Sequence, residues 1–355
     1  MNFLKKNSYI FLSLLVFIPV FLYLFGCTAE TNIYYQNGLK NYEAGNIRIA
    51  LIEFDKALIT EPDNEKILLL LGNTENKLGM YSSAMEHYTK AVKIDSNFEE
   101  AYLNRGIAYM ALGNNRKAIL DFDKVLEINP KNSSALFNRG YLNSYLNNMK
   151  KALRDYDQAI SIDSINSRLY VNRGNIKGKL DDHEGAIEDF NKAISLNKND
   201  DRAYLNRGND KAILGEYENA VKDFDKAIEL NPYSPDEYFI RGDTKNKMGN
   251  YKEAVEDFST AIKLDSSYLP AYFSLGEAKI NLQNYEGAIK DYSLIIQINP
   301  RNGKAYYKRG MCYIIWKKKK EACKDLNKAG ELGYLAAYPA IQKFCKTKTY
   351  KKRKK

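Results

Sequence analysis

Few side chains in this 355-residue sequence are suited to covalent or metal chemistry. It contains only two histidines, His87 and His183, and four cysteines. Neither histidine has a cysteine or a second histidine at the spacing of a zinc site, and no glycine-rich phosphate-binding loop stands apart from the regular glycines described below. We therefore expect no catalytic residue, no metal, no cofactor and no small-molecule substrate, and predict that the protein is not an enzyme.

Asparagine, in contrast, recurs at a constant interval of 34 residues, as Asn104, Asn138, Asn172 and Asn206. An asparagine amide offers both donors and an acceptor, which is what the backbone of an extended polypeptide requires. Two further asparagines, three residues beyond the last two of these, would widen the polar strip: Asn175 and Asn209. The alternative is that these side chains are simply hydrated.

The same interval identifies the elements that carry the asparagines. Glycine recurs at it nine times from Gly38 to Gly310, and alanine recurs nine times from Ala50 to Ala322. Residues 31–336 are therefore nine units of equal length, which begin at residues 31, 65, 99 and so on. Aromatic residues keep the interval at eight of nine places: Phe54, Tyr88, Phe122, Tyr156, Phe190, Phe224, Phe258 and Tyr292.

Each unit has the pattern of two helices. In residues 201–234, one face repeats at three and four residues, and Gly215 marks the left-handed end of a first helix. Ala220 and Phe224 then lie on the apolar face of a second helix. The glycine at position 8 of each unit, here Gly208, predicts a close approach of the two helices, with the aromatic residue beside it.

This pattern resembles the tetratricopeptide repeat (TPR), whose signature has glycine at position 8, alanine at 20 and 27, aromatic residues at 4 and 24 and proline at 32. The resemblance implies an all-α, right-handed α-solenoid, or superhelix, of nine helix-turn-helix units and a C-terminal capping helix over residues 337–348. It also implies one continuous concave groove, into which position 6 points. The asparagine row then resembles the ladder that holds peptide backbones in O-linked N-acetylglucosamine transferase.

Arginine at position 7 accompanies aspartate at position 23 in six units. The TPR family usually has an apolar residue at position 7, and a partly buried arginine without a partner is costly. We predict that these residues form structural ion pairs. The eighth unit departs from the rule, with Leu275 and Asp291. The six expected pairs are Arg105 with Asp121, Arg139 with Asp155, Arg173 with Asp189, Arg207 with Asp223, Arg241 with Asp257 and Arg309 with Asp325.

Residues 1–26 have the features of a signal peptide or membrane anchor. Lys5 and Lys6 precede twenty residues without charge, and residues 24–27 resemble a bacterial lipobox that ends in Cys27. We predict lipidation of Cys27, a short linker over residues 27–30 and a membrane-anchored, extracytoplasmic protein. A retained single-span anchor and a secreted form are the alternatives.

Positive charge is concentrated at the C-terminal end. The net charge is +10, and residues 303–355 contain 17 lysines and arginines against three acidic residues. Residues 349–355 form a basic tail. The alternative function is therefore docking of the basic C-terminus on an anionic surface, lipid or polyanion. The sequence lacks the aromatic and basic pattern of RNA-binding folds, which disfavours nucleic acid.

Three cysteines besides Cys27 lie near the C-terminus: Cys312, Cys323 and Cys345. We favour the interpretation that all three cysteines serve as small, buried apolar residues. If a disulfide forms, the expected pair is Cys312 with Cys323, because both lie in one helical hairpin.

Together these features predict a non-enzymatic protein interaction scaffold that is tethered to a membrane. It would bind extended peptide segments of partner proteins in the groove and assist the assembly or localisation of an envelope complex.

Overall fold

The computed structural model describes residues 31–345, and all regular structure in this range is helical. No strand occurs among these residues. The first helix of each unit begins at the first residue of the unit. These helices are residues 31–43, α3 (Glu65–Lys77), α5 (Glu99–Ala111), α7 (Ser133–Tyr145), α9 (Ser167–Lys179), α11 (Asp201–Ile213), α13 (Pro235–Lys247), α15 (Leu269–Asn281) and α17 (Gly303–Ile315).

The second helices keep the same interval along the chain. They are α2 (Ile47–Thr60), α4 (Tyr81–Ile94), α6 (Asn115–Ile128), α8 (Met149–Ile162), α10 (His183–Leu196), α12 (Tyr217–Leu230), α14 (Tyr251–Leu264), α16 (Tyr285–Ile298) and α18 (Lys319–Glu331). The expected all-α fold of consecutive helix pairs is therefore confirmed.

The turn inside each helix pair depends on one residue at position 15 with a left-handed backbone. Five of these residues are glycines with φ between 73° and 84°, and Asn147 and Asp181 adopt φ of 63° and 64°. The turns expected from these residues are confirmed. Gln283 and Lys317 also adopt φ of 59°, which the sequence did not indicate.

The glycine at position 8 lets the two helices of a unit pack closely. A Cβ atom added to Gly208 would lie 2.6 Å from Cε1 of Phe224, and a Cβ atom added to Gly106 would lie 2.7 Å from Cε1 of Phe122. Both aromatic rings are completely buried. The predicted close approach is confirmed, since a side chain at these positions would displace the ring.

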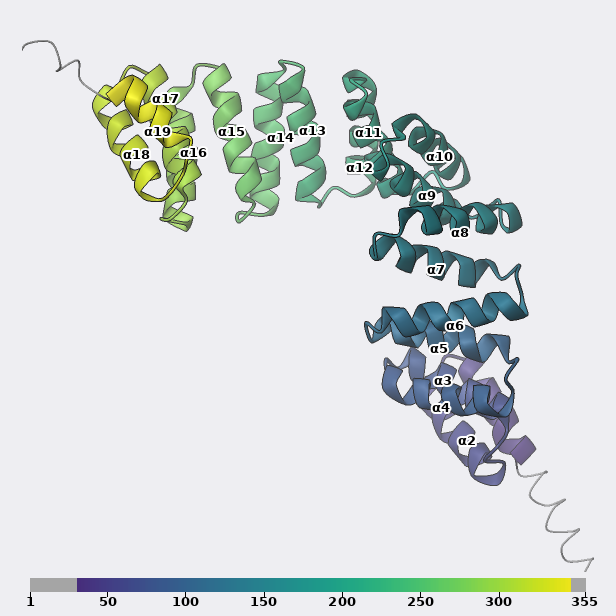
Figure 1. Ribbon diagram of the computed structural model, residues 1–355. Coiled ribbons are helices and arrows are strands. Elements are labelled where there is room, and N and C mark those ends of the chain that lie inside the picture. Colours follow the sequence, from purple (N-terminus) through teal and green to yellow (C-terminus); the bar gives the residue numbers. More distant parts are fainter. Residues whose placement is uncertain (1–30, 346–355) are drawn as a thin grey trace, which may run out of the picture. The chain divides into compact units, whose positions relative to one another are not determined.

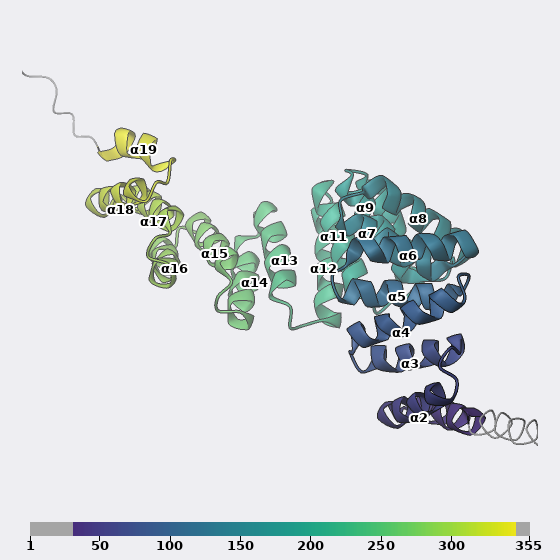
Figure 2. The same ribbon diagram turned by 60° about the horizontal axis from the view of Figure 1, so that its bottom comes forward.

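The described chain divides into two compact units, residues 31–172 and residues 173–345, with the boundary inside α9. In the first unit, the pairs α3–α4, α5–α6 and α7–α8 are stacked in chain order (Figure 1). In the second unit, α13 to α18 are stacked in the same manner (Figure 2). Each stack buries the alanine and the aromatic or leucine side chain of its second helices.

The C-terminal cap begins at Ala337 and is not one regular α-helix in the described residues. It consists of α19 (Ala337–Ala340) and a π-helical turn, η1 (Ile341–Cys345). Pro339 lies in the first turn of α19, where its missing N–H costs no helical hydrogen bond.

Our expectation for the cysteines is wrong. A disulfide joins Cys323 of α18 to Cys345 of η1, with their Cα atoms 5.5 Å apart, and Cys312 is a free buried thiol. The cap packs against α18 and brings Cys345 to Cys323. Cys312 instead packs in the core of the neighbouring helix pair, near the backbone carbonyl of Tyr285.

No helix within residues 31–345 is long and apolar enough to cross a bilayer. Cys27, the predicted signal or anchor over residues 1–26, the last part of the predicted cap and the basic tail all lie outside the described residues.

Candidate functional site

The arginines at position 7 link the two helices of their own unit. Arg105 donates from Nε and Nη2 to the two carboxylate oxygens of Asp121, at 2.8 and 2.7 Å. Asp121 is only 5% exposed. The predicted ion pairs are confirmed, because the same two-pronged contact occurs in all six: Arg105–Asp121, Arg139–Asp155, Arg173–Asp189, Arg207–Asp223, Arg241–Asp257 and Arg309–Asp325.

These arginines also reach the preceding unit. The Nη1 atom of Arg139 donates to Asp123 at 2.7 Å, and that of Arg241 donates to Asp225 at 2.6 Å. Each of these two arginines therefore joins three helices. The hydrogen bond to Asp325 raises the pKa of Arg309, so the guanidinium remains charged in its partly buried position.

A lysine at position 11 shares the aspartate in several units. Lys211 Nζ lies 2.8 Å from Asp223, and Lys245 Nζ lies 2.9 Å from Asp257. The exception in the eighth unit follows from this arrangement. Among the described residues, Lys279 alone pairs with Asp291, at 2.8 Å, so that position 7 can hold the buried Leu275.

The asparagines at position 6 do not form one uniform row. Asn104 Nδ2 donates to Oδ1 of Asn73, and Asn206 Nδ2 donates to Oδ1 of Asn175, both at 2.8 Å. In each contact, position 6 reaches position 9 of the preceding unit, as Lys308 does with Glu277 at 2.6 Å. Within residues 31–345, no hydrogen bond joins one of the four position-6 asparagines to another.

The other candidate asparagines differ in their surroundings. Asn138 Nδ2 donates at 2.9 Å to the backbone carbonyl of Ser134 on its own helix, while Asn172 is partly exposed. Asn104, Asn138 and Asn172 belong to the first compact unit, and Asn175, Asn206 and Asn209 belong to the second. A surface built from them is therefore described for each unit separately.

Sequence reasoning missed two tyrosines of the first compact unit. Tyr141 and Tyr145 lie on the stripe of α7 that also carries Asn138, because residues three and four apart share a helix face. They are 48% and 71% exposed. Near the start of this helix, the guanidinium of Arg168 lies 4.8 Å from the centre of the Phe137 ring. Large aromatic residues at positions 9 and 13 of a single unit were the signal available in the sequence.

Sequence profiles of the repeat family match most of the described chain. The profile "TPR repeat" matches residues 72–113 and 242–283. Two profiles named "Tetratricopeptide repeat" match residues 99–132, 167–200 and 201–234, and residues 133–166, 269–302 and 303–332. More than half of the chain is covered. The chain belongs to the tetratricopeptide repeat family.

Two solved structures with TM-scores of 0.50 or more share the fold. A tetratricopeptide repeat protein from Parabacteroides merdae is 22% identical, with a TM-score of 0.53, and the match covers 70% of this chain and 99% of that chain. The APC/C hetero-tetramer Cut9–Hcn1 is 14% identical, with a TM-score of 0.50, over 89% of this chain and 76% of that one. YrrB, described as a TPR protein with an unusual peptide-binding site, is 24% identical, with a TM-score of 0.47, over 53% and 96%. No curated protein matches the chain.

TPR proteins are generally non-enzymatic scaffolds for protein interactions. Both histidines of this TPR protein have structural contacts. His87 Nδ1 lies 2.7 Å from Glu75, and His183 Nδ1 lies 2.7 Å from the buried Asp210. Burial raises the pKa of the Cys312 thiol to about 11, which disfavours the nucleophilic thiolate. Among residues 31–345, no group of three or more His, Cys, Asp or Glu side chains could hold a metal ion.

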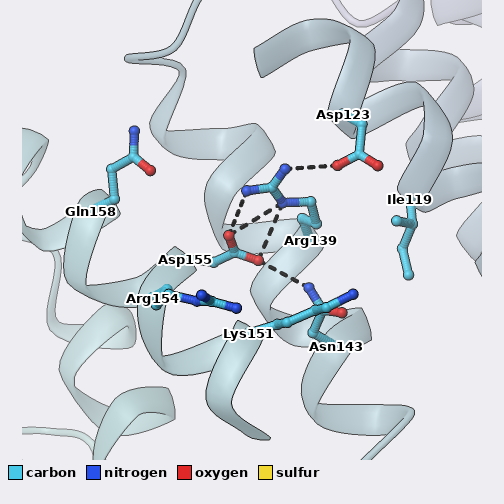
Figure 3. A pocket seen from close by; sticks show the side chains of 8 residues that line it. All are labelled: Ile119, Asp123, Arg139, Asn143, Lys151, Arg154, Asp155 and Gln158. Atoms are coloured by element: carbon cyan, nitrogen blue, oxygen red, sulfur yellow. Dashed lines mark hydrogen bonds and ion pairs between the residues drawn. The ribbon is translucent and has the colours of Figure 1, made fainter. Parts of the chain in front are cut away.

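A pocket of about 380 Å³ lies between α6, α7 and α8 of the TPR stack (Figure 3). Its lining includes the ion-pair network: Arg139 contacts Asp155 and Asp123, and Asn143 donates to Asp155 at 3.0 Å. Arg139 and Asn143 project from the opposite side of α7 to Tyr141, since residues two apart lie about 200° apart around a helix. The pocket therefore belongs to the packing of the repeats rather than to the tyrosine surface.

Proposed function

We propose that this TPR protein is a membrane-tethered, extracytoplasmic scaffold that binds extended peptide segments of partner proteins on its first helices. In this role it assists the assembly or localisation of an envelope complex. The observation that carries the proposal is the exposed pair Tyr141 and Tyr145 beside Asn138 on α7. Tyrosine offers a large rigid surface and a hydroxyl, and asparagine offers hydrogen bonds to a peptide backbone.

The asparagine contacts are compatible with this function. Asn104 uses one N–H to reach Asn73, and its carbonyl oxygen remains an acceptor. The contacts between positions 6 and 9 hold the amides at fixed places on the helices. A pre-organised side chain loses less conformational freedom when a peptide binds. We therefore retain Asn104, Asn138, Asn172, Asn206, Asn175 and Asn209 as candidate peptide-binding residues.

Removing the tyrosine pair is expected to weaken peptide binding strongly. A photo-crosslinking amino acid at position 141 identifies the bound segment, and a synthetic peptide of that segment measures affinity. We expect Tyr141→Ala with Tyr145→Ala to lower this affinity about 30-fold or more, since buried tyrosines often dominate interfaces. The matched control is Tyr233→Ala, because Tyr233 is 80% exposed in the turn before α13.

Two results would contradict the peptide-binding proposal. One is unchanged affinity in the double tyrosine variant. The other is a crosslink at position 141 only to folded domains, with no peptide that binds alone. Replacing Asn104, Asn138, Asn172 and Asn206 together by Ala tests the amides separately: weaker binding of every peptide sequence supports backbone recognition, and unchanged binding removes it.

The location of the protein rests on the lipobox resemblance and on the disulfide. Structural disulfides persist in oxidising compartments and are rare in the cytosol. The Cys323–Cys345 bond therefore supports an extracytoplasmic protein. The lipobox-like residues before Cys27 support a lipid anchor.

Lipidation is tested by the mass of the mature protein. We expect the chain to begin at an acylated Cys27 and to incorporate labelled fatty acid, and we expect Cys27→Ala to abolish the label and to leave the protein unprocessed. A mature mass that retains residues 1–26 indicates the single-span anchor. An unacylated chain that begins after residue 26 indicates the secreted form.

A further inference from the structure

The turn between α17 and α18 carries an unusual concentration of unpaired positive charge. We define the lysine turn as Trp316 and Lys317–Lys320. All four lysines are exposed, and none has a carboxylate partner within 4.0 Å among residues 31–345. The pKa of Glu286 on α16 is lowered by its hydrogen bond to Lys290 and, to a smaller extent, by the charge of Lys318. That carboxylate already pairs with Lys290 at 3.0 Å.

The backbone of the lysine turn is conformationally unfavourable for its sequence. Lys317 has φ of 59°, at the position where five other units have glycine. A side chain with a Cβ atom is strained in this left-handed conformation, which asparagine and aspartate tolerate better than lysine. Glycine at this position would relieve the strain, so the turn geometry alone does not explain a lysine there.

The electrostatics of the lysine turn are also unfavourable within the protein. Lys318 is the N-cap of α18 and makes no side-chain cap hydrogen bond within the described residues, and Lys319, Lys320 and Glu321 follow in the first turn. A helix N-terminus carries partial positive charge and favours anions. Six other second helices have asparagine or aspartate as the N-cap: Asn46, Asn114, Asn148, Asp182, Asn250 and Asn284.

The left-handed backbone is not particular to this turn, since Gln283 adopts the same φ of 59° in the preceding unit. The clustering of lysines at a helix N-terminus is particular to it and indicates a function outside the fold, because a sequence usually agrees with its own local structure except at functional sites. An anionic partner would relieve the repulsion between the lysines and the helix N-terminus. The four lysines and the N-terminus of α18 together outweigh the single acidic residue of the first turn, Glu321.

The neighbouring side chains indicate which anionic surface fits. Trp316 is the only tryptophan of the chain, and Lys318 Nζ lies 3.6 Å from the centre of its ring. Ile315 beside it is 47% exposed. Tryptophan prefers the boundary between lipid headgroups and hydrocarbon, where lysines meet anionic headgroups. Binding of single-stranded nucleic acid instead uses several aromatic platforms along a groove.

We propose that the lysine turn docks on the headgroups of an anionic lipid bilayer. This contact would hold the C-terminal end of the TPR chain at the membrane, independently of peptide binding. The sequence after the cap adds further positive charge. The Cys323–Cys345 disulfide fixes η1 to α18, and residues 346–355 after it add seven lysines and arginines without an acidic residue.

The single tryptophan provides a direct test in the full-length protein. The protein is reconstituted in vesicles of phosphatidylcholine alone or of an equimolar mixture of phosphatidylcholine and phosphatidylglycerol. In the anionic vesicles, we expect the emission of Trp316 to shift to shorter wavelength and to be quenched by brominated lipid. High salt should reverse both effects, because it screens the headgroup charge.

Charge variants measure the contribution of the lysines. Each lysine near an anionic surface strengthens binding about fivefold, so replacing Lys317–Lys320 by Gln is expected to lower the affinity for anionic vesicles more than about 100-fold. A matched variant replaces four lysines that already pair with carboxylates, Lys56, Lys124, Lys226 and Lys247, and should retain most of the affinity.

Lys317→Gly distinguishes docking from a structural role. It is expected to raise thermal stability, by relieving the left-handed strain, and to lower vesicle affinity about fivefold. Three results would overturn the proposal: no change in Trp316 emission in anionic vesicles, equal losses in the turn variant and the matched variant, or tighter lysine-dependent binding of a single-stranded DNA 20-mer than of the vesicles.

Discussion

Replacing Asp223 by Ala is expected to lower the free energy of unfolding by about 3–5 kcal/mol. Asp223 is 4% exposed and accepts hydrogen bonds from Arg207 and Lys211. Its removal leaves two partly buried cations without their carboxylate, which costs far more than an exposed ion pair contributes. Urea denaturation measures the effect, and hydrogen exchange should show it first in α11 and α12.

Two comparison variants test the reason for this loss. Asp225 lies on the same helix and also contacts an arginine, Arg241, but its side chain is 54% exposed. Asp225→Ala should therefore cost less than about 1 kcal/mol. Arg207→Leu reproduces the natural arrangement of the eighth unit, where a lysine alone neutralises the aspartate, and should cost less than Asp223→Ala. Equal costs in all three variants would show that pairing at Asp223 is not the stabilising feature.

Replacing Glu237 by Gln is expected to stabilise the protein above neutral pH by about 1–2 kcal/mol, allowing for solvent screening. Position 3 is occupied by an aliphatic residue in every other unit, and Glu237 is only 3% exposed. Within residues 31–345, its Oε2 atom has no hydrogen-bond partner. Burial raises the pKa of Glu237 to about 7, and the negative charges of Asp201 and Asp236 add to this effect.

The sign of the pH dependence follows from the raised pKa. Between about pH 4.5 and 7, the folded protein binds more protons at Glu237 than the unfolded chain does. The contribution of Glu237 to the free energy of unfolding is therefore fully present below pH 4.5 and is lost as the pH rises through 7. Glu237→Gln removes this loss, because glutamine stays neutral.

The measurement is the urea midpoint at pH 5 and pH 8. Wild type should lose stability between these values relative to Glu237→Gln. Glu229→Gln is the control, since Glu229 is 67% exposed and forms only a surface pair with Lys226. An identical pH dependence in wild type and Glu237→Gln would show that the carboxyl group is not protonated in the folded protein.

The sequence alone was sufficient for the repeated parts of the structure. A constant interval along the chain specifies which residues of two consecutive helices meet, because equivalent positions make equivalent contacts in every unit. Gly208 against Phe224 and Arg105 with Asp121 were predictable for this reason. The left-handed turns at glycine, asparagine and aspartate followed from backbone sterics.

The candidate site was predictable only in part. The asparagine row is visible as a pattern, but the partner of Asn104 is Asn73 on the preceding unit, and Tyr141 and Tyr145 gain importance only through their exposure. The strain at Lys317 likewise requires the backbone angle. Whether a side chain stays accessible depends on all of its neighbours, which spacing along one helix does not give.

The sequence by itself determined that the chain is an array of helix pairs whose two helices meet through glycine, alanine, an aromatic ring and an ion pair. These contacts recur at fixed short separations, so the period encodes them. Only the tertiary structure decided that Cys345 bonds to Cys323 and that Glu237 is buried with no hydrogen-bond partner for Oε2 in the described part of the chain. Both depend on non-repeated residues, and their contacts are set by how the chain packs around them.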